Sequence, residues 1–274
     1  MTLAVNLLLE SSVNFMQDIT RQQQWLARLE PDLRDLGQQI IAMRERGLRI
    51  SQKQDQSPVT DADHLADREL QKILQATHPF PVISEESYVP DKALPDAYWC
   101  VDPIDSTKNF ISGGDAFSIN IALIENSKPI FGILFFPAQN LLAAGGRDLV
   151  ARQIDGKGHL RELKASLVAT GNLRLVVSSP GQGRMERLAP YLPSDHSIVA
   201  VKRLDGAGKF LHIASGAADL YPRLTHLSEW DLAAGHAIIE AAGGEVTTTT
   251  GAEINYGQRL DLRCPHFLAW GKKS

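Results

Sequence analysis

The chain has 274 residues, of which 43% are hydrophobic, and its formal net charge at pH 7 is −4. This length and composition indicate a globular protein with one large domain or two packed halves. The small net charge excludes a broad basic surface for nucleic acid, so any recognition of phosphate has to be local.

The first third of the sequence predicts helices. Residues 1–45 favour a helix because Leu, Ile and Met recur among Gln, Arg and Glu. Its apolar start lacks a basic segment and stops at Glu10, so it does not predict a signal peptide. The stretch 46–57 predicts a loop or an irregular hairpin. A second helix is expected over 61–76, because Pro79 disfavours helix in the residue before it.

Strands are expected to dominate the middle of the chain. The runs 82–83 and 98–101 are short and apolar, and acidic residues follow each of them closely. Residues 117–125 and 129–136 predict an antiparallel hairpin across the polar connection between them. A further pair of strands is expected on either side of 155–158.

The second half mixes strands with helices. Its expected strands cover 173–178, 197–203 and 219–224. Its expected helices cover about 207–215 and 230–242, and Gly243-Gly244 closes the second of them. The earlier pair Gly145-Gly146 is interpreted as a turn. Helices first, then largely antiparallel strands, then mixed elements predict a layered α+β fold rather than a doubly wound parallel sheet.

Composition also limits the cellular location that the sequence predicts. No run of about 18 or more apolar residues predicts a membrane-spanning helix. Cys100 and Cys264 are too few for a disulfide framework or a zinc cluster. We therefore expect a cytoplasmic protein with no membrane span and no nucleic-acid partner.

Acidic residues are concentrated in four segments, two of which directly follow apolar runs. The segments are Thr60-Asp61-Ala62-Asp63, Ser84-Glu85-Glu86-Ser87, Asp102-Pro103-Ile104-Asp105 and Trp230-Asp231. Carboxylates at strand ends gather where layered folds place ligand sites. Mg²⁺ prefers oxygen ligands, and clustered carboxylates repel one another without a cation. Pro103 fixes the backbone between the two aspartates, so that the carbonyl of Ile104 could join the ligands.

Each segment also has a simpler interpretation. Thr60 with Asp63, and Ser228 with Asp231, fit the capping box that begins many helices. Glu85-Glu86 fits a solvated turn, and the two aspartates around Pro103 fit a polar turn that closes a strand. Taken alone, the residues predict an acidic metal site and leave these alternatives open.

Together, the segments resemble the inositol monophosphatase superfamily of Mg²⁺-dependent, lithium-sensitive phosphatases. That family carries a G/S-E-E-S type segment, then D-P-I/L-D-G-T, then W-D-x-A-A-G. Here these stand as residues 84–87, 102–107 and 230–235, and the likeness extends over roughly 35–270. The stretches SPVTDAD, FSINIALIENSKPIFGILFFP and GKFLHIASGAADLYPRL are most similar to the branch of bacterial 3'(2'),5'-bisphosphate nucleotidases, which belongs to sulfur metabolism.

The resemblance implies a layered α/β/α/β/α sandwich of the sugar phosphatase type. Its expected parts are an N-terminal helical extension (1–34) and a phosphatase domain (35–274), with an α+β subdomain (35–170) and an α/β subdomain (171–274). The site is expected between the two subdomains, in a monomer or homodimer. The implied reaction converts 3'-phosphoadenosine 5'-phosphate to AMP and phosphate.

The resemblance also implies a role for each matched residue. Two Mg²⁺ ions are expected on a set of five ligands, which are Glu85, Asp102, the Ile104 carbonyl, Asp105 and Asp231. Asp63 is expected near a third ion and orients Thr107, whose hydroxyl helps to activate the attacking water; Glu85 is counted with these catalytic groups.

Substrate binding is expected from a second set of residues. Ser106, Thr107, Lys108 and Asp231 are expected to hold the phosphate. Lys209 and Arg223 are candidates for the second phosphate or the nucleoside, with ordinary surface cations as the alternative.

Two single positions depart from the family pattern, and so does the stretch 225–229, which replaces a segment that usually contains Gly-Pro. Ser106 replaces the usual glycine; it would cost about 1–2 kcal/mol if the backbone there has positive φ, and could serve as a helix cap if it does not. Gly206 stands where the nucleotidase branch often has serine. The alternatives kept open are an inositol or sugar-phosphate phosphatase and, in another class, a catalytically silent protein that binds metal and phosphate.

Overall fold

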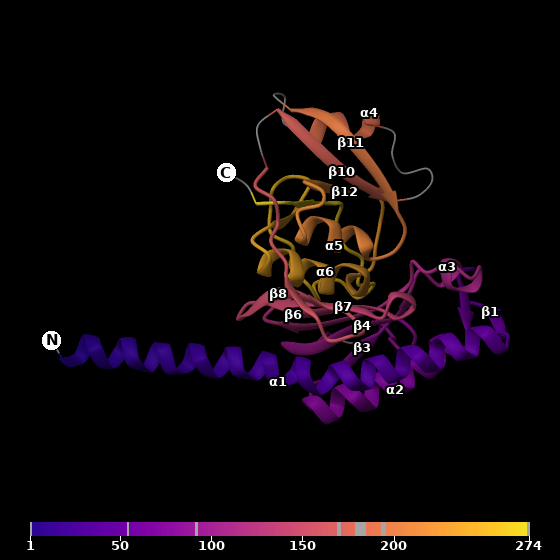
Figure 1. Cartoon of the computed structure of the whole chain (residues 1–274), viewed down its shortest axis with the longest axis horizontal. Helices are drawn as coiled ribbons and strands as arrows, with labels where there is room; N and C mark the ends of the chain where they lie inside the picture. Colours follow the sequence, from indigo (N-terminus) through magenta and orange to yellow (C-terminus); the bar gives the residue numbers. More distant parts are fainter. Residues whose placement is uncertain are drawn as a thin grey trace.

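The computed structural model describes residues 2–53, 55–90, 93–168, 171–178, 185–192 and 196–272, with side chains from residue 21 onward except at 185–186. Five layers follow one another through the molecule (Figure 1). Two helices, a large sheet, two further helices, a smaller sheet and a short outer helical segment make up these layers. The predicted layered α+β class is therefore confirmed.

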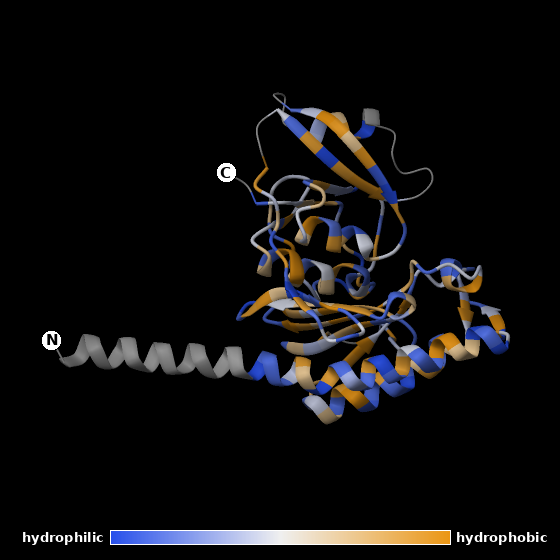
Figure 2. Ribbon diagram, viewed as in Figure 1, coloured by the Kyte–Doolittle hydropathy of each residue, from blue (hydrophilic) through white to orange (hydrophobic). Residues whose placement is uncertain are grey.

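The first layer consists of helices α1 (Thr2–Arg46) and α2 (Asp61–Thr77), which pack against one face of the large sheet. Hydrophobic and hydrophilic residues are interspersed along the described part of α1 and along α2 (Figure 2). Trp25, Leu29, Leu33 and Leu36 are buried because their spacing of three or four residues places them on one face of α1. Three of them precede residue 35, where the phosphatase domain was expected to begin; the domain boundaries stay predictions.

The large sheet has seven strands in the order β3-β4-β5-β6-β7-β8-β9. They are β3 (Val82–Ser84), β4 (Ala97–Asp105), β5 (Ser118–Glu125), β6 (Lys128–Phe136), β7 (Leu141–Gly146), β8 (Leu149–Ile154) and β9 (Leu160–Glu162). All neighbours pair antiparallel except β3 and β4. The predicted hairpin is confirmed as β5 and β6.

The interpretation of Gly145-Gly146 as a turn is wrong, because both residues lie inside strand β7. The reason is the tight packing of helix α6 (Glu229–Ala241) across this strand. A β-carbon on Gly145 would lie 2.9 Å from the Ala241 β-carbon and 3.2 Å from the Ile238 α-carbon. Glycine here permits a close approach of helix and sheet.

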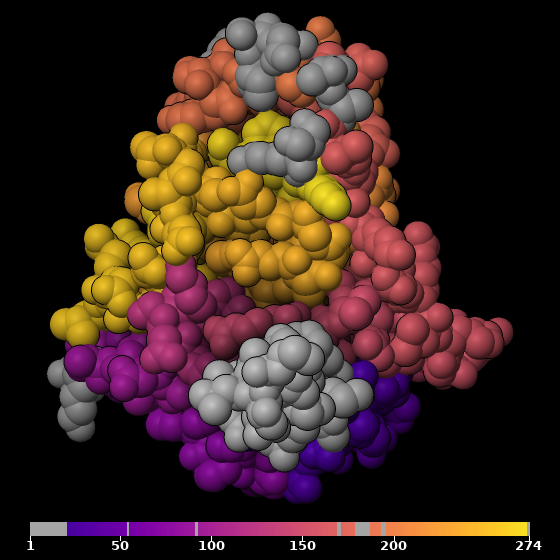
Figure 3. Space-filling model, turned by 90° about the vertical axis from the view of Figure 1, so that its left-hand side faces the viewer, coloured from indigo at the N-terminus to yellow at the C-terminus, as the bar shows by residue number. Residues whose placement is uncertain are grey.

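The inner helices α5 (Gly208–Ala214) and α6 lie between the large sheet and a second sheet of five strands, whose order is β11-β10-β12-β14-β13. Its strands are β10 (Asn172–Ser178), β11 (Ser197–Leu204), β12 (Leu220–Arg223), β13 (Glu245–Thr248) and β14 (Phe267–Trp270). Small side chains such as Ala233 and Ala234 let α6 fit into this layer. The second half, orange to yellow, thus stacks on the first half (Figure 3).

Short elements complete the described chain. They are the hairpin β1 (Ile50–Gln52) and β2 (Pro58–Thr60), α3 (Thr107–Ile111), η1 (Pro137–Gln139), α4 (Met185–Leu188) and η2 (Ala189–Tyr191). The hairpin confirms one of the two alternatives predicted for residues 46–57. Among the described residues, no helix combines the length and apolar character that crossing a membrane would require.

Candidate active site

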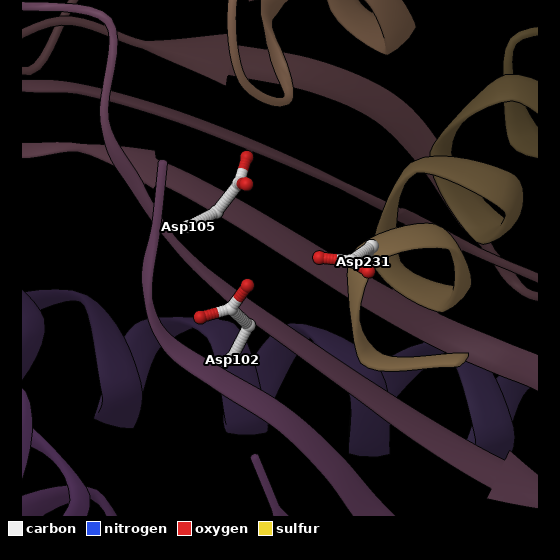
Figure 4. Close-up of side chains that lie close together, drawn as sticks. All are labelled: Asp102, Asp105 and Asp231. Carbon is white, nitrogen blue, oxygen red and sulfur yellow. The ribbon is translucent and has the colours of Figure 1, made fainter. Parts of the chain in front are cut away.

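Asp102 and Asp105 lie at the end of β4, where the strand is irregular. In a regular strand, residues three apart point to opposite faces of the sheet. Here Asp102 pairs with Asn120 and Asp105 with Ser118, so the register shifts between the two aspartates. Such an irregularity re-aims side chains. As a result both carboxylates face the same place, where they meet Asp231 (Figure 4).

Asp231 enters this cluster from the first turn of α6. Its Oδ2 accepts a hydrogen bond of 2.8 Å from the backbone N–H of Ser228, so the predicted helix-capping contact is present. Even so, one carboxylate oxygen each from Asp102, Asp105 and Asp231 lies within 4.8 Å of the others. The side chain of Asp231 therefore caps the helix and also belongs to the acidic cluster.

The three carboxylates are costly to ionise together. Burial, followed by the charges of Asp105 and Glu85, raises the pKa of Asp231 to about 8. Burial, then Glu85 and the other aspartates, also raises the pKa of Asp102, and burial raises that of Asp105. A cation at their centre would relieve this repulsion, and an all-oxygen donor set suits a hard divalent ion such as Mg²⁺. The cluster can therefore hold metal.

Asp63 and Thr107 form a second polar pair beside the cluster. Asp63 is 1% exposed, and its Oδ2 accepts the N–H of Thr60 at 2.8 Å, which completes the predicted capping box of α2. Its Oδ1 lies 3.3 Å from the hydroxyl of Thr107, which also lies 3.1 Å from the Ile104 carbonyl. The helix cap thus fixes one carboxylate oxygen and leaves the other facing Thr107.

Glu85 lies near the cluster, and its charge raises the pKa values of the three aspartates. It is bound to a lysine that the sequence analysis did not single out. Lys53, between β1 and β2, places its Nζ 2.6 Å from Glu85 Oε1 and 2.7 Å from Glu86 Oε1. Burial alone would lower the pKa of Lys53, but the two glutamates outweigh it and raise that pKa. Lys53 is therefore a built-in counter-charge for Glu85.

Replacing Lys53 with methionine tests this balance of charge. We expect a lower thermal midpoint of the metal-free protein, because Glu85 and Glu86 lose their shared partner. We also expect Mg²⁺ to bind about threefold to tenfold more tightly, since a charged hydrogen bond of about 1 kcal/mol no longer competes for Glu85. Calorimetric titration with Mg²⁺ measures the change, and Lys72→Met serves as control because Lys72 is exposed and pairs with Glu69 on its own helix, α2. Unchanged Mg²⁺ affinity would contradict the competition.

Asp105 and Asp231 of the cluster line a cleft of about 660 Å³ to which both halves contribute. From the second half, Lys209 is 5% exposed, so the alternative of an ordinary surface cation does not hold for it. Its Nζ donates to the carbonyls of Leu204 and Gly206, and burial lowers its pKa to about 8. Arg223 reaches the cleft from β12 and donates through Nη1 to the Ser178 hydroxyl at 2.8 Å.

The start of α3 contributes to the cleft from the first half. Ser106, Thr107 and Lys108 all line the cleft, and Lys108 is exposed. Ser106 has φ 68° and ψ 46°, and its side chain makes no capping hydrogen bond to the helix. The alternative that Ser106 serves as a helix cap is therefore wrong, and the position does require positive φ.

A layered α+β fold with a carboxylate cluster beside a cleft is typical of hydrolases that use metal ions. Residues 22–270 match the inositol monophosphatase family. The chain belongs to this family, and the resemblance inferred from the acidic motifs is confirmed.

Relatives within the family carry a more specific name. The 3'(2'),5'-bisphosphate nucleotidase CysQ of Buchnera aphidicola is 34% identical over 215 residues, which cover 77% of this chain and 79% of that protein. The protein of the same name from Escherichia coli strain K12 is 34% identical over 226 residues, 80% of this chain and 87% of that protein. The chain thus spans most of the length of these relatives.

Solved structures agree with this placement. The crystal structure of CysQ from Bacteroides thetaiotaomicron, titled a bacterial member of the inositol monophosphatase family, has a TM-score of 0.73 at 28% identity. It covers 92% of this chain and 98% of that one. An IMPase from Thermotoga maritima, at 23% identity and a TM-score of 0.70 over 89% of this chain and 91% of that one, shares the fold.

Proposed function

We propose that the chain is a Mg²⁺-dependent phosphomonoesterase that hydrolyses 3'-phosphoadenosine 5'-phosphate to AMP and phosphate. The observation that carries the proposal is the convergence of Asp102, Asp105 and Asp231 within 4.8 Å, beside a large cleft that Asp105 and Asp231 line. The names of the relatives at 34% identity support the nucleotide as substrate. The family supports phosphate ester hydrolysis as the chemistry.

The carboxylates are assigned the metal-binding role. Asp102, Asp105, Asp231, Glu85 and the carbonyl of Ile104 would hold two Mg²⁺ ions, with Asp63 near a third. When bound, Mg²⁺ neutralises charge on the phosphate and on the leaving oxygen. For Glu85 to take part, Lys53 has to release one of its two carboxylate partners, and it can keep the other at Glu86.

Thr107 and Asp63 are assigned the orientation of the attacking water. The Thr107 hydroxyl donates toward Asp63 or the Ile104 carbonyl, and its remaining lone pair can accept a hydrogen bond from water. Water oriented in this way attacks phosphorus in line, so no phosphorylated enzyme forms. As the bond from the water oxygen to phosphorus forms, the bond from phosphorus to the ester oxygen breaks. The attacking water loses its proton to solvent, and the leaving oxygen takes up a proton from solvent to become the hydroxyl of AMP.

Two basic residues in the cleft support a substrate with two phosphates. Lys209 and Arg223, both from the second half, line the same cleft as Asp105 and Asp231. A volume of about 660 Å³ is in the range that encloses a drug-sized or nucleotide-sized ligand. An inositol monophosphate would leave both cations without a phosphate partner, which makes it the second choice.

A comparison of substrates tests the proposal. With Mg²⁺, we expect kcat/KM for 3'-phosphoadenosine 5'-phosphate to exceed that for inositol 1-phosphate by at least about 100-fold, because two charge-assisted phosphate contacts at about 1.5–3 kcal/mol each are lost. Release of inorganic phosphate measures both rates. Arg223→Lys, which keeps the charge but loses the forked geometry, should reduce only the nucleotide rate. The opposite ranking of substrates would establish the inositol phosphatase alternative.

A further inference from the structure

Ser106 has a strained backbone that a glycine would avoid. Its φ of 68° lies in the left-handed region, which a β-carbon disfavours. Its hydroxyl does not cap α3 but donates instead toward Oδ1 of Asp105, at 3.3 Å. Residues kept in such conformations concentrate at functional sites, where the surrounding structure maintains them. The strain therefore calls for a function of the Ser106 side chain.

The space beside the Ser106 hydroxyl is shaped by Gly206 on the opposite half. Gly206 also has positive φ, of +60°. A β-carbon at this position would lie 3.1 Å from Ser106 Oγ, 3.3 Å from Asp105 Oδ2 and 2.6 Å from the Ala116 carbonyl oxygen. Any side chain at 206 would therefore push on both Ser106 and Asp105. The serine at 106 and the glycine at 206 fit together as one unit.

The loop around Gly206 also fixes Asp105 from the second half. The backbone N–H of Ala207 donates a hydrogen bond to the Asp105 carboxylate, and the charge of Lys209 favours its ionised form. Lys209 in turn is tied to this loop by its bonds to the carbonyls of Leu204 and Gly206. Asp105 is thus oriented by one donor from its own half and one from the other.

We propose that Ser106 is a positioning residue for Asp105, and that it can act only because Gly206 has no side chain. The Ser106 hydroxyl fixes the rotation of the Asp105 carboxylate, so that its oxygens face Asp102 and Asp231 before a cation arrives. This inference rests on the metal-binding part of the proposed function. It explains Ser106 and Gly206, two of the departures from the family pattern, by the close approach of the two halves at these residues.

Two substitutions of Ser106 separate orientation from strain. Ser106→Gly and Ser106→Ala both remove the hydroxyl, but only glycine relieves the left-handed backbone. We expect both variants to bind Mg²⁺ about fivefold to tenfold more weakly by calorimetric titration, the loss of one hydrogen bond to a charged group. We expect only Ser106→Gly to raise the thermal midpoint of the metal-free protein.

Ser127 supplies a matched control. It is a second serine with positive φ, 63°, and it lies in the connection between β5 and β6, where its hydroxyl accepts a hydrogen bond from Gln258. Ser127→Gly and Ser127→Ala should leave Mg²⁺ affinity unchanged. If Ser106→Gly and Ser106→Ala also bind Mg²⁺ within about twofold of the wild type, the positioning role is overturned.

A double-mutant cycle tests the pairing with Gly206. Gly206→Ser alone should weaken Mg²⁺ binding, because its β-carbon displaces Ser106 and Asp105. If the two single changes in the Mg²⁺ dissociation constant were independent, they would multiply in the double variant Ser106→Gly/Gly206→Ser. We expect the double variant to bind Mg²⁺ at least about threefold more tightly than that product. Independent effects would overturn the pairing. These readouts use metal binding, so wild-type protein that binds Mg²⁺ but hydrolyses no nucleotide would refute the proposed function and leave this test intact.

Discussion

Replacing Asp105 with asparagine is expected to reduce turnover by about 1,000-fold and, in the absence of metal, to stabilise the fold. Turnover falls because a metal ligand contributes several kcal/mol to the stabilisation of charge in the transition state, and each 1.36 kcal/mol is a factor of ten in rate. The gain in stability follows because asparagine removes one of several mutually repelling carboxyl groups, and the charge of Asp105 is a cause of the raised pKa of both Asp102 and Asp231.

The two effects have opposite signs, which distinguishes a metal site from a structural one. A stabilisation of about 1 kcal/mol would raise the thermal midpoint by roughly 2–4 °C. Differential scanning calorimetry without metal and phosphate release with Mg²⁺ measure the two quantities. Asp115→Asn is the control, because its side chain is 73% exposed and lies 3.9 Å from Arg44. That variant should match the wild type in both measurements.

Two results would reject the present assignment. Asp105→Asn with wild-type turnover would mean that the reaction occurs elsewhere. Wild-type protein that binds Mg²⁺ but releases no phosphate from any member of a panel of phosphomonoesters would establish the silent binding protein. In that case the stabilisation by Asp105→Asn should persist, because it depends only on repulsion among carboxylates.

Local pattern was sufficient to predict most of the fold. The hairpin β5–β6 and helix α6 are long apolar runs with clear ends, a polar connection between the two strands and Gly243-Gly244 after the helix, so their type could be read from the sequence. Strand β7 was missed because its small residues, ending in Gly145-Gly146, carry no strand signal of their own. Its conformation depends on pairing with β6 and on close packing by α6, which are tertiary contacts.

The sequence predicted which residues form the candidate site better than it predicted the contacts between them. Asp102, Asp105 and Asp231 were named from motifs, and they do come together. Sequence spacing could not show that an irregular strand brings Asp102 and Asp105 to one face. Nor could it place Lys53 on Glu85, because that contact depends on how the β1–β2 connection lies against the turn after β3. A lone lysine shortly before the SPVTDAD stretch was the available signal.

Raising the pH should tighten the binding of Mg²⁺ and destabilise the metal-free protein. Asp231 has a pKa raised from 3.8 to about 8, by burial first and then by Asp105 and Glu85. Below pH 3.8 the carboxyl is protonated in both the folded and the unfolded states. Between 3.8 and about 8, the unfolded chain has lost this proton while the folded chain keeps it, so stability falls as pH rises, by at most about 1.4 kcal/mol per pH unit.

Metal binding should show the opposite dependence, since the cation needs the ionised carboxylate. One displaced proton makes the Mg²⁺ dissociation constant fall by up to about tenfold per pH unit below pH 8. Calorimetric titration at pH 6, 7 and 8, in two buffers with different ionisation enthalpies, measures both the affinity and the number of protons released. We expect at least about one proton at pH 7, because the pKa of Asp102 is raised as well as that of Asp231. A pH-independent affinity would show that the cluster is already ionised without metal.

Two variants identify which carboxyl group is responsible. Glu229 titrates in the same range, because burial raises its pKa to about 7, but its oxygens accept hydrogen bonds from Gly257 N–H and Tyr98. Glu229→Gln should therefore flatten the dependence of stability on pH while Mg²⁺ binding still releases a proton. Asp231→Asn should weaken Mg²⁺ binding and also remove most of the proton release. A structural carboxylate and a metal ligand differ in the number of protons that Mg²⁺ binding releases. The two variants therefore distinguish a carboxyl group that stabilises the fold from one that binds the cation.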